Sequence, residues 1–214
     1  MEYKRILAVG AHPDDVELGC LGTLLKFRDQ GAEFDIVVAR NDNVPRPSVW
    51  RDREKMIQEY QASEELIGVK FHFLDNRLDD TGRPVLEWNS KTVEQLDNYI
   101  RGRQYDLVIT HSPGDHHQDH VNTFNIVNSS LRRYQGELWV MEGGPYANRN
   151  KDFVPTVFVD IADYIDTKIK AVQCYDSYFN ETLLHNIQGQ AALRGQMLGS
   201  KYAEAFEVRY RCIR

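Results

Sequence analysis

Residues 4–15, which read KRILAVGAHPDD, hold a short apolar run that ends in a cluster of polar side chains. The run ILAV, from Ile6 to Val9, shows no polar alternation, which is typical of a strand buried on both faces. Similar runs return as IVVA at 36–39 and as LVIT at 107–110. Each strand is followed by a stretch of helical periodicity. These helical stretches lie near Glu17 to Gln30, Arg51 to Leu66, Thr92 to Arg103 and Gln118 to Arg133. Strands that alternate with helices predict right-handed βαβ crossovers and a parallel sheet.

We therefore expect an α/β fold with a Rossmann-like, doubly wound, mostly parallel sheet and helices on both of its faces. After about Gly144 the pattern changes to a strand in TVFVDI (156–161), helical spacing in DYIDTKIKAVQCYDSY (163–178), and a last helix before AFEVRYRCI (205–213). This part of the chain predicts a C-terminal extension of strands and helices against the core. The 214 residues fit a single domain, 1–214, at roughly 150 residues per domain.

Composition excludes several classes of protein. The chain has 26 Lys and Arg against 32 Asp and Glu, so its net charge of -6 does not suit binding to nucleic acid. The uncharged run near the N-terminus covers only Ile6 to Ala11, which is short for a signal segment or a membrane span, and we expect a cytoplasmic protein. The three cysteines, Cys20, Cys174 and Cys212, are widely separated and predict neither a disulfide framework nor a sulfur-based metal site.

The first polar cluster, AHPDDVELG, places His12, Asp14, Asp15 and Glu17 at the end of the first predicted strand. His12 and Asp15 are three residues apart on a tight turn, where both can bind one ion while Asp14 points elsewhere. Imidazole and carboxylate are suitable zinc ligands. For this segment alone the alternative is that Asp14 or Asp15 caps the following helix, since Asp is a favoured N-cap. The glycines lack the GxGxxG spacing of a dinucleotide turn, so a nicotinamide cofactor is not indicated.

The second polar cluster, HSPGDHHQDH, follows the strand at 107–110 and holds His111, Asp115, His116, His117, Asp119 and His120. A solvated polar loop is the other explanation for this segment. If the strand order is 3-2-1-4-5, the first and fourth strands are neighbours where the winding direction reverses, and both clusters open into one crevice. His117 and His120 then face the same way at the start of a helix.

Together the two clusters supply a three-ligand site, His12, Asp15 and His120, with a fourth position open for water, as catalytic zinc requires. One zinc per chain is expected, and iron is accepted by the same nitrogen and oxygen ligands. Asp14 and His117 remain as an unligated acid and base beside the ion.

At these motifs, AHPDD at 11–15 and HQDH at 117–120, the sequence resembles the PIG-L/LmbE-like family of zinc deacetylases. PTVFVDIADYIDTKIKA and RGQMLGSKYAEAFE near the C-terminus are also similar to this family. The resemblance implies removal of the acetyl group from an N-acetylglucosamine-type sugar or its conjugate, and a homo-oligomer. It implies that His12, Asp15 and His120 bind zinc and that Asp14 is the general base. His117 would stabilise the oxyanion or act as an acid, and Asp119 would orient His117.

Two departures from the family pattern stand out. The usual AHPDDE reads AHPDDVE here, which moves the acid to Glu17 and leaves the chemistry intact. The loop after the second strand reads ARNDN in place of a Gly-Glu form, so the sequence leaves the sugar open. Glu17 is expected either to support a ligand or to face solvent.

Other residues have weaker claims on function. Arginines in or after that loop could grip an anionic group of the substrate, although surface arginines are usually solvated: Arg40, Arg46, Arg51 and Arg53. Three aromatic residues could stack on a sugar but more often such residues fill cores: Trp50, Tyr146 and Tyr202. His72 and His185 are expected to be structural. Two other functions stay open, a zinc amidase for a larger acyl or peptide-like amide, and a non-catalytic sugar- or nucleotide-binding module.

Overall fold

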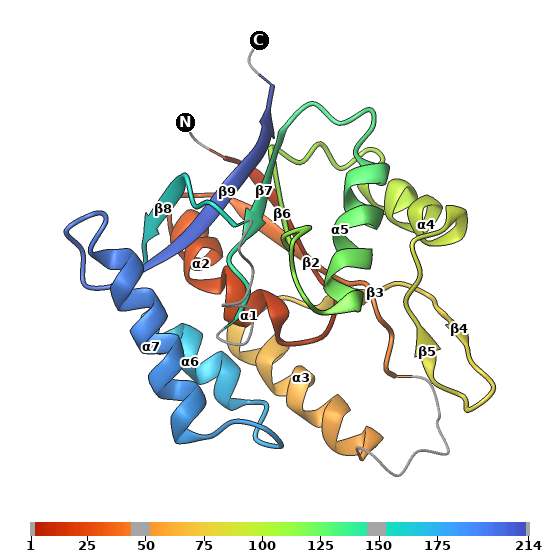
Figure 1. The fold of residues 1–214 in the computed structure, drawn as a ribbon, viewed down its shortest axis with the longest axis horizontal. Coiled ribbons are helices and arrows are strands. Elements are labelled where there is room, and N and C mark those ends of the chain that lie inside the picture. Colours follow the sequence, from red (N-terminus) through yellow and green to blue (C-terminus); the bar gives the residue numbers. More distant parts are fainter. Residues whose placement is uncertain (1–2, 44–51, 145–152, 213–214) are drawn as a thin grey trace.

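The computed structural model describes residues 3–43, 52–144 and 153–212, and its centre is a twisted seven-stranded sheet (Figure 1). Five parallel strands run in the order β3, β2, β1, β6, β7, and β9 then pairs antiparallel with both β7 and the edge strand β8. Their bounds are β1 Arg5–Gly10, β2 Glu33–Val38, β3 Phe71–Phe73, β6 Leu107–Thr110, β7 Glu137–Met141, β8 Val157–Asp160 and β9 Ala203–Arg211. The predicted doubly wound, mostly parallel sheet is confirmed.

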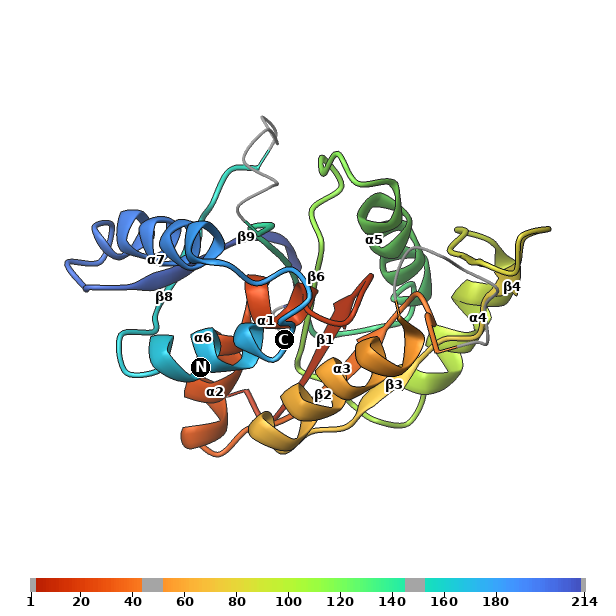
Figure 2. The ribbon, with the colours of Figure 1, turned by 90° about the horizontal axis from the view of Figure 1, so that it is seen from below.

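Helices cover both faces of the sheet. The bounds are α1 Asp15–Gly19, α2 Leu21–Asp29, α3 Arg53–Ile67, α4 Ser90–Ile100, α5 Gln118–Ser130, α6 Ile165–Gln173 and α7 Glu181–Gly195. Figure 2 shows α4 and α5 on one side of the central strands and α1, α2 and α6 on the other. The C-terminal extension therefore consists of β8, α6, α7 and β9, and α7 packs against β9.

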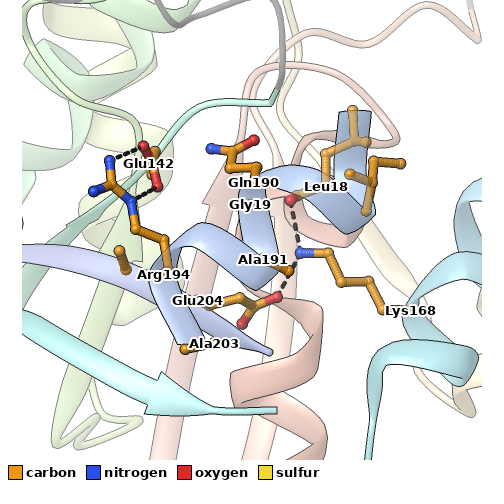
Figure 3. Close-up of a pocket in the computed structure, with 11 residues that line it drawn as sticks. Leu18, Gly19, Glu142, Lys168, Gln190, Ala191, Arg194, Ala203 and Glu204 are labelled. Atoms are coloured by element: carbon orange, nitrogen blue, oxygen red, sulfur yellow. Dashed lines mark hydrogen bonds and ion pairs between the residues drawn. The ribbon is translucent and has the colours of Figure 1, made fainter. Parts of the chain in front are cut away.

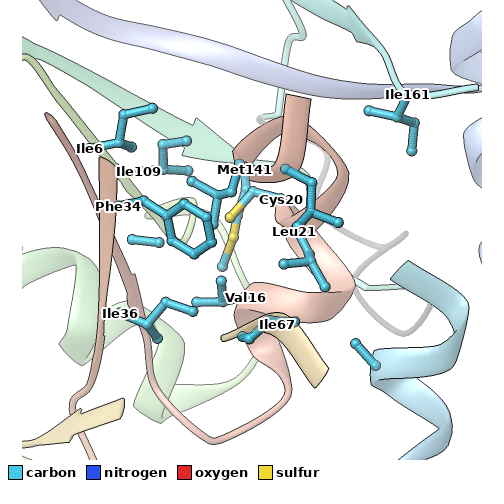
Figure 4. Close-up of a cluster of buried hydrophobic side chains, with 14 of the residues drawn as sticks. Ile6, Val16, Cys20, Leu21, Phe34, Ile36, Ile67, Ile109, Met141 and Ile161 are labelled. Carbon is cyan, nitrogen blue, oxygen red and sulfur yellow. The ribbon is translucent and has the colours of Figure 1, made fainter. Parts of the chain in front are cut away.

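The apolar run in β1 shows why the sequence folds into layers. Ile6 and Ala8 point into the core beneath α1, α2 and α3, whereas Leu7 and Val9 point into the core beneath α4 and α5. All four side chains are at most 1% exposed, as the continuous run predicts for a central parallel strand. Figure 4 shows the first of these cores, where Ile6 lies among the apolar side chains of neighbouring strands and helices.

Two local features were not expected. The single helix expected from Glu17 to Gln30 is divided at Cys20, whose φ of -148° interrupts the helical backbone between α1 and α2. Beside this break a Cβ on Gly19 would lie 2.3 Å from the Met141 sulfur, so a larger residue would have to displace the Met141 side chain of β7. The second feature, for which the sequence analysis gave no expectation, is a small hairpin of β4 (Arg77–Leu78) and β5 (Pro84–Val85), connected by residues 79–83.

The sheet order also places the two polar clusters side by side. β1 and β6 are paired in parallel, with Val9 opposite Thr110, so the loops that follow them leave the same edge of the sheet. This is the crevice in which ligands of open α/β sheets bind. In the described part of the chain no helix is both long and apolar enough to cross a membrane.

Candidate active site

His12, Asp15 and His120 converge at the carboxyl ends of β1 and β6. His12 Nδ1 lies 3.5 Å from Asp15 Oδ2, and His120 Nε2 lies 3.4 Å from Asp15 Oδ1. One ligand atom from each residue lies within 4.8 Å of those from the other two, which is close enough for one metal ion to bridge them. The chain thus presents a cluster of two imidazoles and a carboxylate at the edge where a ligand is expected.

Each of these two imidazoles turns its other nitrogen toward a second carboxylate. His12 Nε2 lies 3.0 Å from Asp119 Oδ2, and His120 Nδ1 lies 2.8 Å from Asp115 Oδ2. Metal-bound histidines almost always donate their other N–H to such an acceptor, which fixes the ring and its tautomer. Asp115 was not predicted to have a role, although its position five residues before His120 was visible in the sequence.

The negative charge around the histidines favours a cation. Burial lowers the pKa of His12, but the hydrogen bonds to Asp119 and Asp15 outweigh this effect and raise it to about 10. Burial likewise lowers the pKa of His120, and its bonds to Asp115 and Asp15 raise it to about 9. These carboxylates stabilise positive charge on the rings, and the same field would stabilise a divalent ion between them.

Asp14 sits in an unusual conformation at the start of α1. Its φ of 137° and ψ of -26° lie in a region that residues other than glycine rarely adopt, and within the described chain its side chain makes no capping bond. The alternative of Asp14 as a helix cap is therefore not supported. Its Oδ2 accepts a 2.6 Å hydrogen bond from the Tyr178 hydroxyl. Burial and the adjacent Asp15 raise the pKa of Asp14 to about 7, a value suited to proton transfer near neutral pH.

Asp15 is buried and tightly held. Its Oδ2 accepts a 2.7 Å bond from the His12 backbone N–H and lies 3.1 Å from His111 Nε2. The His111 ring stacks on His120 at a centroid distance of 3.9 Å, so it packs beneath the cluster. Glu17 is also buried, and it accepts 2.6 Å bonds from the hydroxyls of Ser63 and Tyr175, so of its two expected alternatives the solvent-facing one is wrong.

His117 is the N-cap of α5, where its Nδ1 accepts a 3.1 Å bond from the Asp119 backbone N–H. Its ring stacks on His120 with centroids 4.6 Å apart. Asp119 therefore contacts His117 through its amide, whereas its carboxylate bonds to His12 and accepts a 2.7 Å bond from Arg40. The Arg40 guanidinium also lies 3.2 Å from Asp42, so it is already paired with two carboxylates.

The remaining weak candidates lie elsewhere. Arg46, Arg51, Trp50 and Tyr146 fall outside the described residues. Arg53 donates to the backbone of Asn43, and Tyr202 packs against the core under the Lys201 ammonium. His72 stacks on Tyr99, and His185 is exposed on α7, so neither histidine belongs to the His/Asp cluster.

A pocket beside α1 is lined by charged side chains that pair with one another, Lys168 with Glu204 and Arg194 with Glu142 (Figure 3). The buried Lys168 ammonium donates to the Leu18 carbonyl at 2.7 Å and pairs with Glu204, whose carboxylate accepts the backbone N–H groups of Gly22 and Thr23 at the start of α2. This network links α1, α2 and α6 to β9.

The fold and the cluster define a class, an α/β protein with a His/Asp cluster that could hold a metal ion and a further carboxylate, Asp14, beside it. The family model described as PIG-L, GlcNAc-PI de-N-acetylase, matches residues 7–131, which is more than half of the chain and includes both motifs. The chain belongs to the PIG-L family, as its motifs predicted.

Relatives and solved structures agree with this assignment. Diacetylchitobiose deacetylase of Thermococcus kodakarensis is 24% identical over 224 aligned positions, which cover 95% of this chain and 82% of that protein. The structure of N,N'-diacetylchitobiose deacetylase from Pyrococcus horikoshii in complex with an inhibitor superposes with a TM-score of 0.76, at 22% identity over 97% of this chain and 84% of that one.

The same fold also carries different chemistry. The 4-carboxy-2-hydroxymuconate hydratase GalB from Pseudomonas putida has a TM-score of 0.78, at 18% identity over 99% of this chain and 98% of that one. Structural likeness at this level of identity shows the fold, so the reaction must be argued from the site.

Proposed function

We propose that the protein is a zinc-dependent hydrolase that removes the N-acetyl group from an amino sugar of the N-acetylglucosamine type or from its conjugate. The observation that carries the proposal is the convergence of His12, Asp15 and His120, with Asp14 and His117 beside them. Each imidazole of the cluster also contacts a second carboxylate through its other nitrogen. The similarity to diacetylchitobiose deacetylase supports an acetylated sugar as the small-molecule partner.

The donor set fits zinc. Two imidazoles and one carboxylate leave a tetrahedral ion one open position, and the carboxylates of Asp115 and Asp119 orient the imidazoles. One ion per chain is proposed, with iron as an alternative for the same ligands. Zinc, when bound, lowers the pKa of water to about 7 and polarises the amide carbonyl.

Asp14 is proposed as the general base. Tyr178 occupies its Oδ2, and in the described part of the chain no hydrogen bond engages its Oδ1, which leaves an oxygen to accept the proton of the attacking water. Its raised pKa allows it to return this proton to the leaving amine, so one carboxyl group serves as base and then as acid.

His117 is proposed to stabilise the oxyanion. Because its Nδ1 accepts the Asp119 amide proton, the neutral ring carries its own proton on Nε2. Burial and the neighbouring His12 lower the pKa of His117, which favours this neutral form. The ring therefore has an N–H donor fixed for the developing negative charge.

The test combines metal analysis with an acetate-release screen. We expect about one zinc per chain and release of acetate from N-acetylglucosamine or diacetylchitobiose, with Asp14→Asn as the control for contaminating activity. Zinc with hydrolysis only of larger acyl or peptide-like amides would favour the amidase. No metal, no activation by added zinc or iron, and no turnover would favour the non-catalytic binding module.

A further inference from the structure

The C-terminal part of the chain contributes a side chain to the candidate site. Tyr178 follows α6 and lies outside the region matched by the family model, yet its hydroxyl donates a 2.6 Å bond to Asp14 across 164 positions of sequence. We infer that Tyr178 is a positioning residue that holds the Asp14 carboxylate in place for proton transfer. This inference rests on the proposed function of Asp14 as the base.

Asp14 needs such a partner because little else fixes it. Its backbone lies at a φ of 137°, and its side chain makes no capping bond to α1 within the described residues. The neighbouring Asp15 carries like charge, which repels the Asp14 carboxylate. When a phenol hydroxyl bonds to one oxygen of a carboxylate, it fixes the orientation of the group and therefore the position of the second oxygen.

Tyr178 is itself held by its surroundings. It is half-buried against the core, and its ring stacks on Tyr175 with centroids 6.0 Å apart and planes 27° apart. Tyr175 donates a 2.6 Å bond to Glu17 in α1, while Tyr178 bonds to Asp14 just before α1. The two tyrosines and the two acids have the same spacing of three residues. Packing and the ring contact therefore hold the Tyr178 hydroxyl at Asp14, whereas the Tyr175 hydroxyl engages Glu17.

The matched pair Tyr178→Phe and Tyr175→Phe separates positioning from simple support of the fold. Each variant loses one hydroxyl from the same turn, but only Tyr178 contacts Asp14. We expect Tyr178→Phe to lower kcat about 10- to 100-fold with little change in KM or zinc affinity, the scale of a misplaced catalytic group. Tyr175→Phe, or Ser63→Ala if that variant does not fold, should keep kcat within about threefold of wild type.

A double variant tests whether Tyr178 acts through Asp14. If it does, Asp14→Asn/Tyr178→Phe should be no slower than Asp14→Asn alone, because the carboxylate that Tyr178 positions is already gone. Losses that multiply, a wild-type kcat in Tyr178→Phe, or loss of zinc from Tyr178→Phe would each overturn the inference.

A spectroscopic readout decides the inference even if the enzyme releases no acetate. With ¹³C-labelled aspartate and the Asp14 signal assigned from Asp14→Asn, Tyr178→Phe should shift the Asp14 carboxylate resonance and Tyr175→Phe should leave it in place. A wild-type protein that releases no acetate would refute the proposed function. An Asp14 resonance unmoved by Tyr178→Phe would end this inference.

Discussion

Replacing Asp115 with asparagine should weaken zinc binding without removing a proposed zinc ligand. Asp115 Oδ1 accepts a 2.8 Å bond from the His117 backbone N–H, and Oδ2 lies 2.8 Å from His120 Nδ1. Asparagine keeps the first acceptor but places an NH2 group opposite the His120 N–H, where it cannot accept. The Asp115 side chain is only 5% exposed, so water would not readily replace the lost partner.

The expected loss is about 10- to 100-fold in zinc affinity, or about 1.4 to 2.7 kcal/mol, the scale for losing the carboxylate behind a metal-bound histidine. Competition against a fluorescent zinc chelator measures the dissociation constant, and Asp80→Asn, at an exposed position, is the control. Zinc affinity equal to wild type in Asp115→Asn would refute the claim that Asp115 orients a zinc-bound His120.

Three further predictions follow from the contacts. His117→Ala should keep zinc and lower kcat about 10²-fold or more, the cost of one oxyanion donor; loss of zinc would mean that His117 is a ligand. Lys168→Met leaves the Glu204 carboxylate buried without its cation and should lower the free energy of unfolding in urea by about 3 kcal/mol; a change below about 1 kcal/mol would contradict this. In zinc-free protein, burial and the charge of Asp15 should raise the pKa of Asp14 to about 7, which ¹³C NMR can measure. Bound zinc is a nearby positive charge and should lower that pKa. An Asp14 pKa near the ordinary Asp value in the zinc-free protein would contradict this prediction.

The parallel sheet could be predicted because its signal is local. ILAV, IVVA and LVIT each lack alternation, and burial of a strand on both faces leaves that pattern in a few consecutive residues. The meeting of the two motifs followed from strand order, since β1 and β6 are neighbours at the reversal of winding.

The features that escaped prediction depend on contacts between distant segments. The break at Cys20 and the close approach of Gly19 to the Met141 side chain are features that helical periodicity does not report. Tyr178 reads as one more aromatic residue of a helical segment until the fold brings it to Asp14. Arg40 was visible at the right strand end, but only the structure shows that Asp119 and Asp42 already engage it.

The measurement that tests the central claim most directly is zinc content and kcat for Asp14→Asn and Asp15→Asn side by side, with circular dichroism to confirm folding. Asp15→Asn replaces an anionic ligand with a neutral one, so we expect it to lose zinc and activity and to regain part of the activity in excess zinc. Asp14→Asn should keep its zinc and lose about 10²- to 10⁴-fold in kcat, the scale for a general base, with no rescue by added zinc. Loss of metal from Asp14→Asn but not from Asp15→Asn would reverse the two roles, and full activity in both variants would contradict the catalytic account.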